Sequence, residues 1–133
     1  MGACLLDTHA LLWYASNDPR LPAAMAALIA DVEVGIVISR ATLWEIAIKD
    51  SLGKLILPRP YQEWVALIRS FDFTILEISD QHLFQLLTLP PHHRDPFDRL
   101  LIAQAISENL TLLSRDAHFS SYPVRVRWEA SPA

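Results

Sequence analysis

Glycine is scarce in this chain of 133 residues, where it occurs only at Gly2, Gly35 and Gly53. Phosphate-binding loops of the G-x-x-x-x-G-K-[ST] type and G-x-G-x-x-G dinucleotide fingerprints need closely spaced glycines, because the backbone must approach the phosphates. Neither motif can be built from glycines so far apart. The sequence therefore excludes the α/β nucleotide-binding enzymes that depend on these loops.

Cysteine is rarer still, with Cys4 as the only one. A single cysteine cannot form an intrachain disulfide, and its place in an apolar run favours a small packed side chain over a catalytic thiol. Structural zinc sites usually need several cysteines, and the chain has no HExxH motif. His92 and His93 lie near Asp95 in a proline-rich loop, but adjacent side chains point in different directions. We therefore do not expect a zinc site.

Long apolar runs are also missing, although 52% of the residues are hydrophobic. The run at 100–106, interrupted by Gln104, falls far short of the roughly 20 residues that cross a bilayer. No positively charged segment precedes an apolar stretch near Met1, so we expect a cytoplasmic protein with no membrane span. The length and the mean hydropathy of +0.23 indicate one folded domain over residues 1–133.

The chain does contain a regular alternation of short apolar runs and longer helical patterns. Strands are expected at 3–6, 34–38, 73–76 and 110–113, with a final edge strand at 124–128. Helical patterns occupy 11–15, 22–32, 40–51, 61–70 and 80–87, and another begins at Asp95. This alternation predicts an α/β fold built on a mostly parallel sheet.

Four acidic residues stand where the chain passes between a predicted strand and a helix: Asp7, Glu45, Asp98 and Asp116. Asp7 and Asp116 follow strands, and Glu45 lies about one and a half turns into the helix that Ser39 caps. Asp98 lies in the first turn of the helix that Asp95 and Pro96 begin. Because ligands bind at the carboxyl ends of parallel strands, we expect all four carboxylates to face one crevice.

Each of these positions also has an ordinary structural explanation. Asp7 could serve as a helix N-cap, and Asp98 and Asp116 could interact with helix dipoles. Glu45 could pair with Lys49, four residues later on the same helix. Together, however, four carboxylates at one edge would repel each other unless they shared a cation. An all-oxygen site suits Mg²⁺ or Mn²⁺ better than zinc.

A site of this kind is well suited to cleaving phosphodiesters. One or two bound metals can activate a water and stabilise the leaving oxygen, so no protein nucleophile is needed. The sequence has no convincing Ser-His-Asp or Cys-His arrangement. The net charge of -4 argues against attraction of nucleic acid by overall charge, but local basic groups can still bind phosphates. Basic residues near the acids are candidate contacts: Arg40, Lys49, Lys54, Arg94, Arg99 and Arg115.

Aromatic residues and His9 give weaker indications. The tryptophans could stack on bases, but at helical spacing within apolar seams they are more typical of a core or an interface: Trp13, Trp44, Trp64 and Trp128. His9 follows Asp7 by two residues and is expected at the surface or as a support for the site. The apolar helices at 11–15, 22–32 and 61–70 could contact partners, although an intramolecular core explains most of their apolar residues.

Four sequence blocks resemble the PIN-domain ribonucleases, and specifically the VapC-like toxins of type II toxin–antitoxin systems. They are LLDTHALLW at 5–13, SRATLWEIAIKDSLGKLILP at 39–58, RDPFDRLLIAQA at 94–105 and TLLSRDAHF at 111–119. The order and spacing of the blocks make the resemblance specific, and the segment at 60–91 contributes least. The resemblance implies a PIN-like three-layer α/β/α sandwich with a central, mostly parallel sheet, and a metal-dependent endoribonuclease activity.

The same resemblance implies roles for particular residues. Asp7, Glu45 and Asp98 match the family's central metal-binding acids, and Asp116 matches a more variable fourth. Three further residues are auxiliary candidates: Thr8, through a hydrogen bond to Asp7; Asp95, as an N-cap first and a ligand second; and Arg99. The family also implies Mg²⁺ (or Mn²⁺) as cofactor, RNA as substrate, a homodimer and a cognate antitoxin. Two alternatives remain open, a DNase of the same domain class and a noncatalytic module that binds RNA or protein.

Overall fold

Five parallel strands form the centre of the fold, as the computed structural model shows for residues 2–92 and 95–129. The strands are β1 (Cys4–Leu6), β2 (Ile36–Ser39), β3 (Thr74–Leu76), β4 (Thr111–Leu113) and β5 (Val126–Arg127). Their order is β3-β2-β1-β4-β5, and every neighbouring pair is parallel. All the predicted strands are present, and the sheet expected to be mostly parallel is parallel throughout the described chain.

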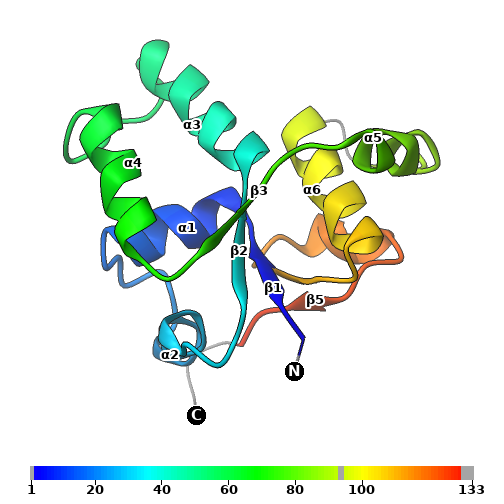
Figure 1. The fold of residues 1–133 in the computed structure, drawn as a ribbon, viewed down its shortest axis with the longest axis horizontal. Coiled ribbons are helices and arrows are strands. Elements are labelled where there is room, and N and C mark those ends of the chain that lie inside the picture. The colour runs from blue at the N-terminus through cyan, green and yellow to red at the C-terminus, as the bar shows by residue number, and fades with distance from the viewer. Residues whose placement is uncertain (1, 93–94, 130–133) are drawn as a thin grey trace.

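Pairs of helices connect the first four strands, and one short 3-10 helix lies between β4 and β5. The helices are α1 (Thr8–Ala15), α2 (Ala23–Ala30), α3 (Arg40–Ser51), α4 (Tyr61–Ser70), α5 (Asp80–Leu87), α6 (Pro96–Ser107) and a short 3-10 helix, η1 (Ala117–Ser121). Figure 1 shows α1, α2 and α4 on one side of the sheet and α5 and α6 on the other. Among the described residues, every helix is too short or too polar to span a membrane.

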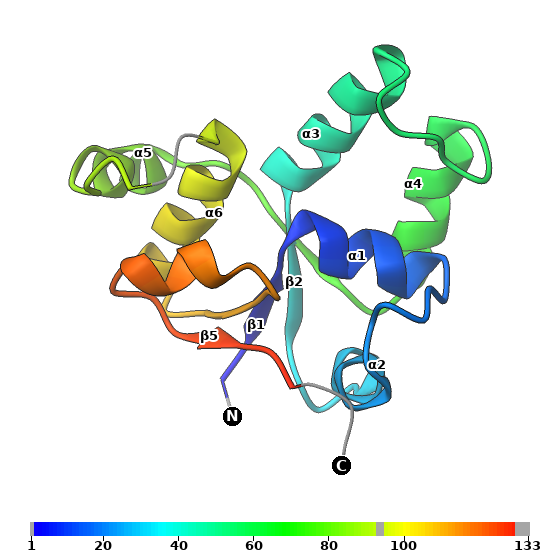
Figure 2. The same ribbon diagram turned by 180° about the vertical axis from the view of Figure 1, so that it is seen from behind.

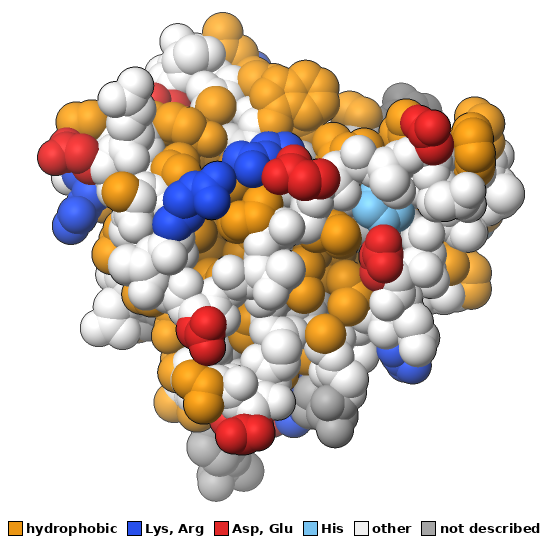
Figure 3. Space-filling view, in the orientation of Figure 1, with side chains coloured by type: hydrophobic (Ala, Val, Ile, Leu, Met, Phe, Trp, Pro, Cys, Tyr) orange, Lys and Arg blue, Asp and Glu red, His pale blue; other side chains and the backbone are white. Residues whose placement is uncertain are grey.

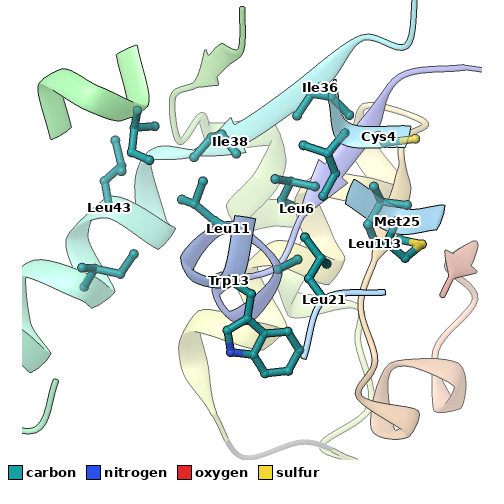
Figure 4. Close-up of a cluster of buried hydrophobic side chains, with 14 of the residues drawn as sticks. Cys4, Leu6, Leu11, Trp13, Leu21, Met25, Ile36, Ile38, Leu43 and Leu113 are labelled. Atoms are coloured by element: carbon teal, nitrogen blue, oxygen red, sulfur yellow. The ribbon is translucent and has the colours of Figure 1, made fainter. Parts of the chain in front are cut away.

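Side chains of β1 alternate between two hydrophobic cores, because successive residues of a strand point to opposite faces. Cys4 and Leu6 pack with residues of α1 to α4, including Leu11 (Figure 4). Leu5 packs on the other face, with α6 residues such as Leu101. Helices therefore cover both faces of the sheet, which confirms the three-layer α/β/α sandwich.

Local capping interactions set the starts of several helices as the sequence predicts. The Ser39 hydroxyl accepts a hydrogen bond from the Ala41 amide at 3.0 Å at the start of α3. Asp95 caps α6 and accepts from the Phe97 amide at 2.9 Å. After α3, Gly53 adopts a φ of 69°, a left-handed conformation that glycine tolerates best.

The order of the strands reverses at β1, and this reversal defines the site. The chain moves outward from β1 through β2 to β3, and then returns to place β4 on the other side of β1. In open parallel sheets, ligands bind at the carboxyl ends of the strands beside such a switch point. Asp7 follows β1 and Ser114 follows β4, so both lie there. Figure 2 shows α1 and α3 beginning at this same edge.

A buried polar chain connects α3, α5 and α6. Gln104 of α6 is fully buried and accepts a hydrogen bond from the Ser39 hydroxyl at 2.5 Å. Its amide nitrogen lies 3.3 Å from Nδ1 of His82, whose Nε2 lies 2.9 Å from a Glu108 carboxylate oxygen. Because α3 carries Glu45 and α6 carries Asp98, this chain helps to fix the relative position of two candidate site residues.

Candidate active site

Asp7 lies at the carboxyl edge of the sheet and is only 6% exposed. Its Oδ1 accepts from the Ala10 amide at 2.8 Å, which makes Asp7 the N-cap of α1. Its Oδ2 accepts from the Ser114 hydroxyl at 2.5 Å. Burial raises the pKa of Asp7, while the hydrogen bonds from Ser114 and Ala10 oppose that rise. The predicted capping role is confirmed, and it orients the carboxylate toward the end of β4.

Glu45 is buried on α3, and hydrogen bonds engage both of its carboxylate oxygens. Oε1 accepts from the Thr8 hydroxyl at 2.6 Å, and Oε2 accepts from the Lys49 ammonium at 2.6 Å. The pairing with Lys49 expected from helical spacing is therefore present, and it raises the pKa of Lys49. The expectation that Thr8 would bond to Asp7 is wrong, because the single hydroxyl proton of Thr8 is donated to Glu45.

Asp98 lies half-buried in the first turn of α6, and its charge interacts with those of the other acidic residues. Its pKa rises to about 7, first because of burial and then because of nearby negative charges on Asp95, Glu45, Asp7 and Asp116. Coulomb interactions weaken with distance and with solvent screening, so these shifts identify neighbouring groups. The four acids predicted from the sequence, together with Asp95, thus lie close enough for their charges to interact, and two of them, Asp7 and Asp116, line one cavity.

Asp95 and Asp116 also cap helices. Asp95 accepts hydrogen bonds from the Phe97 and Asp98 amides at 2.9 and 3.2 Å. Asp116 caps η1 and accepts from the amide of His118 at 2.9 Å. The Asp116 amide donates to Ser114 at 3.0 Å, so Ser114 links the loop after β4 to the carboxylate that follows β1.

The donor chemistry of these acids fits a divalent cation, although other protein groups already donate hydrogen bonds to Asp7 and Glu45. Within residues 2–92 and 95–129, no group of three or more His, Cys, Asp or Glu side chains has the arrangement of a metal site. Asp7 and Glu45 direct their oxygens to protein donors. The crowded carboxylates nevertheless form an all-oxygen set whose mutual repulsion a cation would relieve, which suits Mg²⁺ or Mn²⁺.

Two cavities border the acidic residues. One, of about 340 Å³, is lined by Asp7 and Asp116 together with basic and aromatic side chains. The other, of about 410 Å³, lies between α1 and the segment at 54–58, and Thr8 and Lys49 line it. His9 lines both cavities and is exposed, as expected, with its ring 5.6 Å from that of Trp13.

The basic residues near the acids differ in how many hydrogen bonds and ion pairs they form. Arg40 forms two hydrogen bonds with Glu77, at 3.0 and 2.8 Å, and Lys49 is paired with Glu45. Arg99 donates to the Leu89 carbonyl at 3.3 Å. Two others line cavities beside the acids, Lys54 the larger one and Arg115 the smaller one. Arg94, like His93, lies outside the described residues.

The tryptophans divide between core and surface. Trp13 and Trp64 are buried in the core on the α1 side of the sheet, as helical spacing predicts. Trp44 is 55% exposed, and its ring lies edge-on to Phe97 at 5.1 Å. It therefore joins the surfaces of α3 and α6 next to Glu45 and Asp98, which directly follow these two aromatic residues in the sequence.

Two contributors to the site were missed by sequence reasoning. Ser114 directly follows the strand predicted at 110–113, and its hydroxyl donates to Asp7 across 107 positions of sequence. Arg20 follows a helix break, far in sequence from the acids, but its guanidinium carbon lies 5.1 Å from the centre of the Trp13 ring. No local pattern identifies either contact, because each depends on which strands and loops become neighbours.

Comparison with known proteins identifies the family. The sequence profile of the PIN domain family matches residues 4–124. The chain belongs to the PIN domain family. The resemblance to PIN domains seen in the sequence blocks is thereby confirmed. No curated protein matches the chain at a significant level.

Solved structures share the PIN fold with this chain. VapBC2 from Rickettsia felis, bound to a promoter DNA fragment, has a TM-score of 0.72 at 20% identity, over 94% of this chain and 97% of that one. A toxin–antitoxin complex from Klebsiella pneumoniae has a TM-score of 0.66 at 22% identity, over 98% and 100%. FitAcB from Neisseria gonorrhoeae has a TM-score of 0.69 at 18% identity, over 92% and 95%. At these identities the similarity shows a common fold.

Proposed function

We propose that this PIN domain is a metal-dependent endoribonuclease and the toxin of a type II toxin–antitoxin pair. The observation that carries the proposal is the set of carboxylates around Asp98, at the switch point of the sheet. Such crowding has little use in a protein that only binds RNA, because like charges repel both one another and the phosphates. Membership of the PIN family supports a nuclease, and the toxin–antitoxin structures of the same fold support the toxin role.

Asp7, Glu45 and Asp98 would hold Mg²⁺ or Mn²⁺, with Asp116 assisting. When bound, the cation would supply Lewis-acid stabilisation of the phosphoryl and leaving oxygens and favour ionisation of a water. The chain's own residues prepare the ligands for this task. Ser114 and Ala10 hold Asp7 in place, and Thr8 holds Glu45.

Two side chains would change their protonation or pairing if a cation bound. Asp98, with a pKa of about 7, holds a proton for part of the time at neutral pH and would release it when a cation binds. Lys49 neutralises Glu45 through an ion pair of 2.6 Å and would move away as Glu45 turns to the cation. Its ammonium group would then be available to a phosphate of the substrate.

The proposed partners are an RNA substrate, a second copy of the chain and a cognate antitoxin, all in the cytoplasm. Exposed apolar side chains support contacts with other proteins, since large exposed apolar groups mark interaction surfaces. On α5, Leu83, Phe84 and Leu87 are 43%, 58% and 84% exposed. Figure 3 shows hydrophobic side chains reaching the surface over α5 and at the tops of α3 and α6.

The test compares cleavage of RNA and DNA oligonucleotides of the same sequence. Purified protein is assayed with Mg²⁺, Mn²⁺ or EDTA, beside Asp7→Asn, which keeps an oxygen able to cap α1 but removes the charge. We expect metal-dependent RNA cleavage that the variant loses while it remains folded. Cleavage of DNA alone would favour the DNase. Undiminished RNase activity of folded Asp7→Asn would contradict the proposed site.

A further inference from the structure

The smaller cavity beside the acids combines opposite charges with aromatic rings. Asp7 and Asp116 lie on its wall, and so do Arg20 and Arg115. Trp13 and Trp128 also line this cavity, and their rings lie edge-on with centres 6.2 Å apart. A substrate strand reaching Asp7 would therefore meet two guanidinium groups within the same hollow, beside the partly exposed ring of Trp128.

Trp13 fixes the position of both arginines. The guanidinium carbon of Arg115 lies 4.6 Å from the centre of the Trp13 ring, and that of Arg20 lies 5.1 Å from it. The indole is only 6% exposed and belongs to the hydrophobic core, so it is a stable support. A cation–π contact uses the guanidinium face and leaves the in-plane N–H groups available as donors.

The two arginines differ in what those donors contact. Arg20 is paired with Asp18, through an Nη2–Oδ2 distance of 2.7 Å and an Nε–Oδ1 distance of 3.1 Å. The guanidinium of Arg115, in contrast, makes no hydrogen bond or ion pair with any described residue; its contact is the Trp13 ring. Arg115 is thus an oriented, exposed cation with unused donors, next in sequence to one of the site's acids.

We propose that Arg115, positioned by Trp13, binds a backbone phosphate of a single-stranded nucleic acid substrate beside the acidic residues. This inference rests on the proposed nuclease function and assigns a subsite to it. A planar guanidinium matches the geometry of a phosphate, and its attraction to the strand offsets the repulsion that the nearby carboxylates exert. A combination of cationic and aromatic side chains is typical of surfaces that bind single strands.

Arg115→Gln tests the proposal, with Arg125→Gln as the matched control. Arg125 is also exposed, but it lines a different cavity and donates to the Asn109 carbonyl just before β4, at the opposite edge of the sheet. Binding of a fluorescent single-stranded RNA is measured in EDTA, so that no cleavage occurs, over a series of salt concentrations. Melting temperatures check that the variants are folded.

We expect Arg115→Gln to weaken RNA binding about tenfold. The slope of log K against log salt should become shallower by about 0.7, the value for one phosphate contact to a single strand. Arg115→Lys should keep most of the slope but lose part of the affinity, because lysine keeps the charge and loses the stacked plane. In Mg²⁺, KM should rise for Arg115→Gln with little change in kcat.

The outcomes separate this inference from the function on which it rests. If Arg115→Gln and the wild type share the same affinity and salt slope, the subsite is wrong, even where the wild type cleaves RNA. If the wild type binds RNA but does not cleave it with any metal, the nuclease is wrong, and the binding data still decide the role of Arg115. If the wild type binds no nucleic acid, both proposals fail.

Discussion

Replacing Asp98 by asparagine should stabilise the metal-free protein while abolishing its activity. Asp98 is ionised at pH 8 among four other carboxylates, which together with burial raise its pKa from 3.8 to about 7. A raised pKa means that the folded state binds the proton more tightly than the unfolded state does. The free energy of unfolding therefore falls as pH rises from about 4 to about 7, and the loss is complete above that range.

The pKa change sets the size of the effect. At about 1.4 kcal/mol for each pKa unit, the largest possible gain in the free energy of unfolding is about 4 kcal/mol. Asp98 remains partly in contact with water, which screens its charge, so we expect about a third of that gain, roughly 1.3 kcal/mol at pH 8. For a chain of this length, that corresponds to a rise in Tm of about 4 to 5 °C. The difference should shrink toward pH 4, because Asp98 is then neutral in the folded state and the pH approaches the unfolded pKa of 3.8.

Urea unfolding in EDTA at pH 8 and at pH 5 measures the prediction, with Asp80→Asn as control. Asp80 lies in the first turn of α5, just as Asp98 lies in the first turn of α6. A helix dipole favours a first-turn carboxylate, so removing its charge alone would destabilise both helices by about 0.3–1 kcal/mol. Repulsion within the site predicts stabilisation for Asp98→Asn only. Destabilisation of both variants at pH 8 would refute the reasoning.

Three smaller predictions follow from particular contacts. Ser114→Ala removes the hydrogen bond that lowers the pKa of Asp7, so the acidic limb of the kcat/KM profile should move to higher pH, and an unmoved limb would contradict this. Gln104→Leu removes the acceptor for the Ser39 hydroxyl proton and should lower the free energy of unfolding in urea by about 1–3 kcal/mol. An unchanged value would show that the buried polar chain adds no stability. Burial raises the pKa of Cys4, so iodoacetamide should alkylate it slowly in the folded protein and quickly in urea, and equal rates would argue against its burial.

Local signals in the sequence were sufficient for the helix starts and the strands. Ser39 and Asp95 cap their helices because a cap needs only a side-chain oxygen and the next amides along the chain. The bounds of the last strand were predicted less well. It was expected at 124–128, but only Val126–Arg127 pairs. An edge strand has a neighbour on one side only, so its length depends on that neighbour, here the short β4.

The convergence of the acids could be predicted, but their hydrogen bonds could not. Parallel strands expose their carboxyl ends at one edge, so Asp7 and Asp116 had to lie near each other once the fold class was known. The bond from Thr8 to Glu45 spans 37 positions and depends on how α1 packs against α3. The pKa of Asp98 likewise depends on burial and on four neighbours, which appear only in three dimensions.

The measurement that tests the central claim most directly is cleavage of a mixed cellular RNA pool by the purified, antitoxin-free protein. Reactions contain Mg²⁺, Mn²⁺ or EDTA and run beside Asp98→Asn prepared in the same way, and the new RNA ends are sequenced. We predict discrete cuts that require the metal and disappear in the folded variant. Cuts that persist in EDTA or in Asp98→Asn, or no cuts from folded protein that binds the metal, would contradict a metal-dependent endoribonuclease.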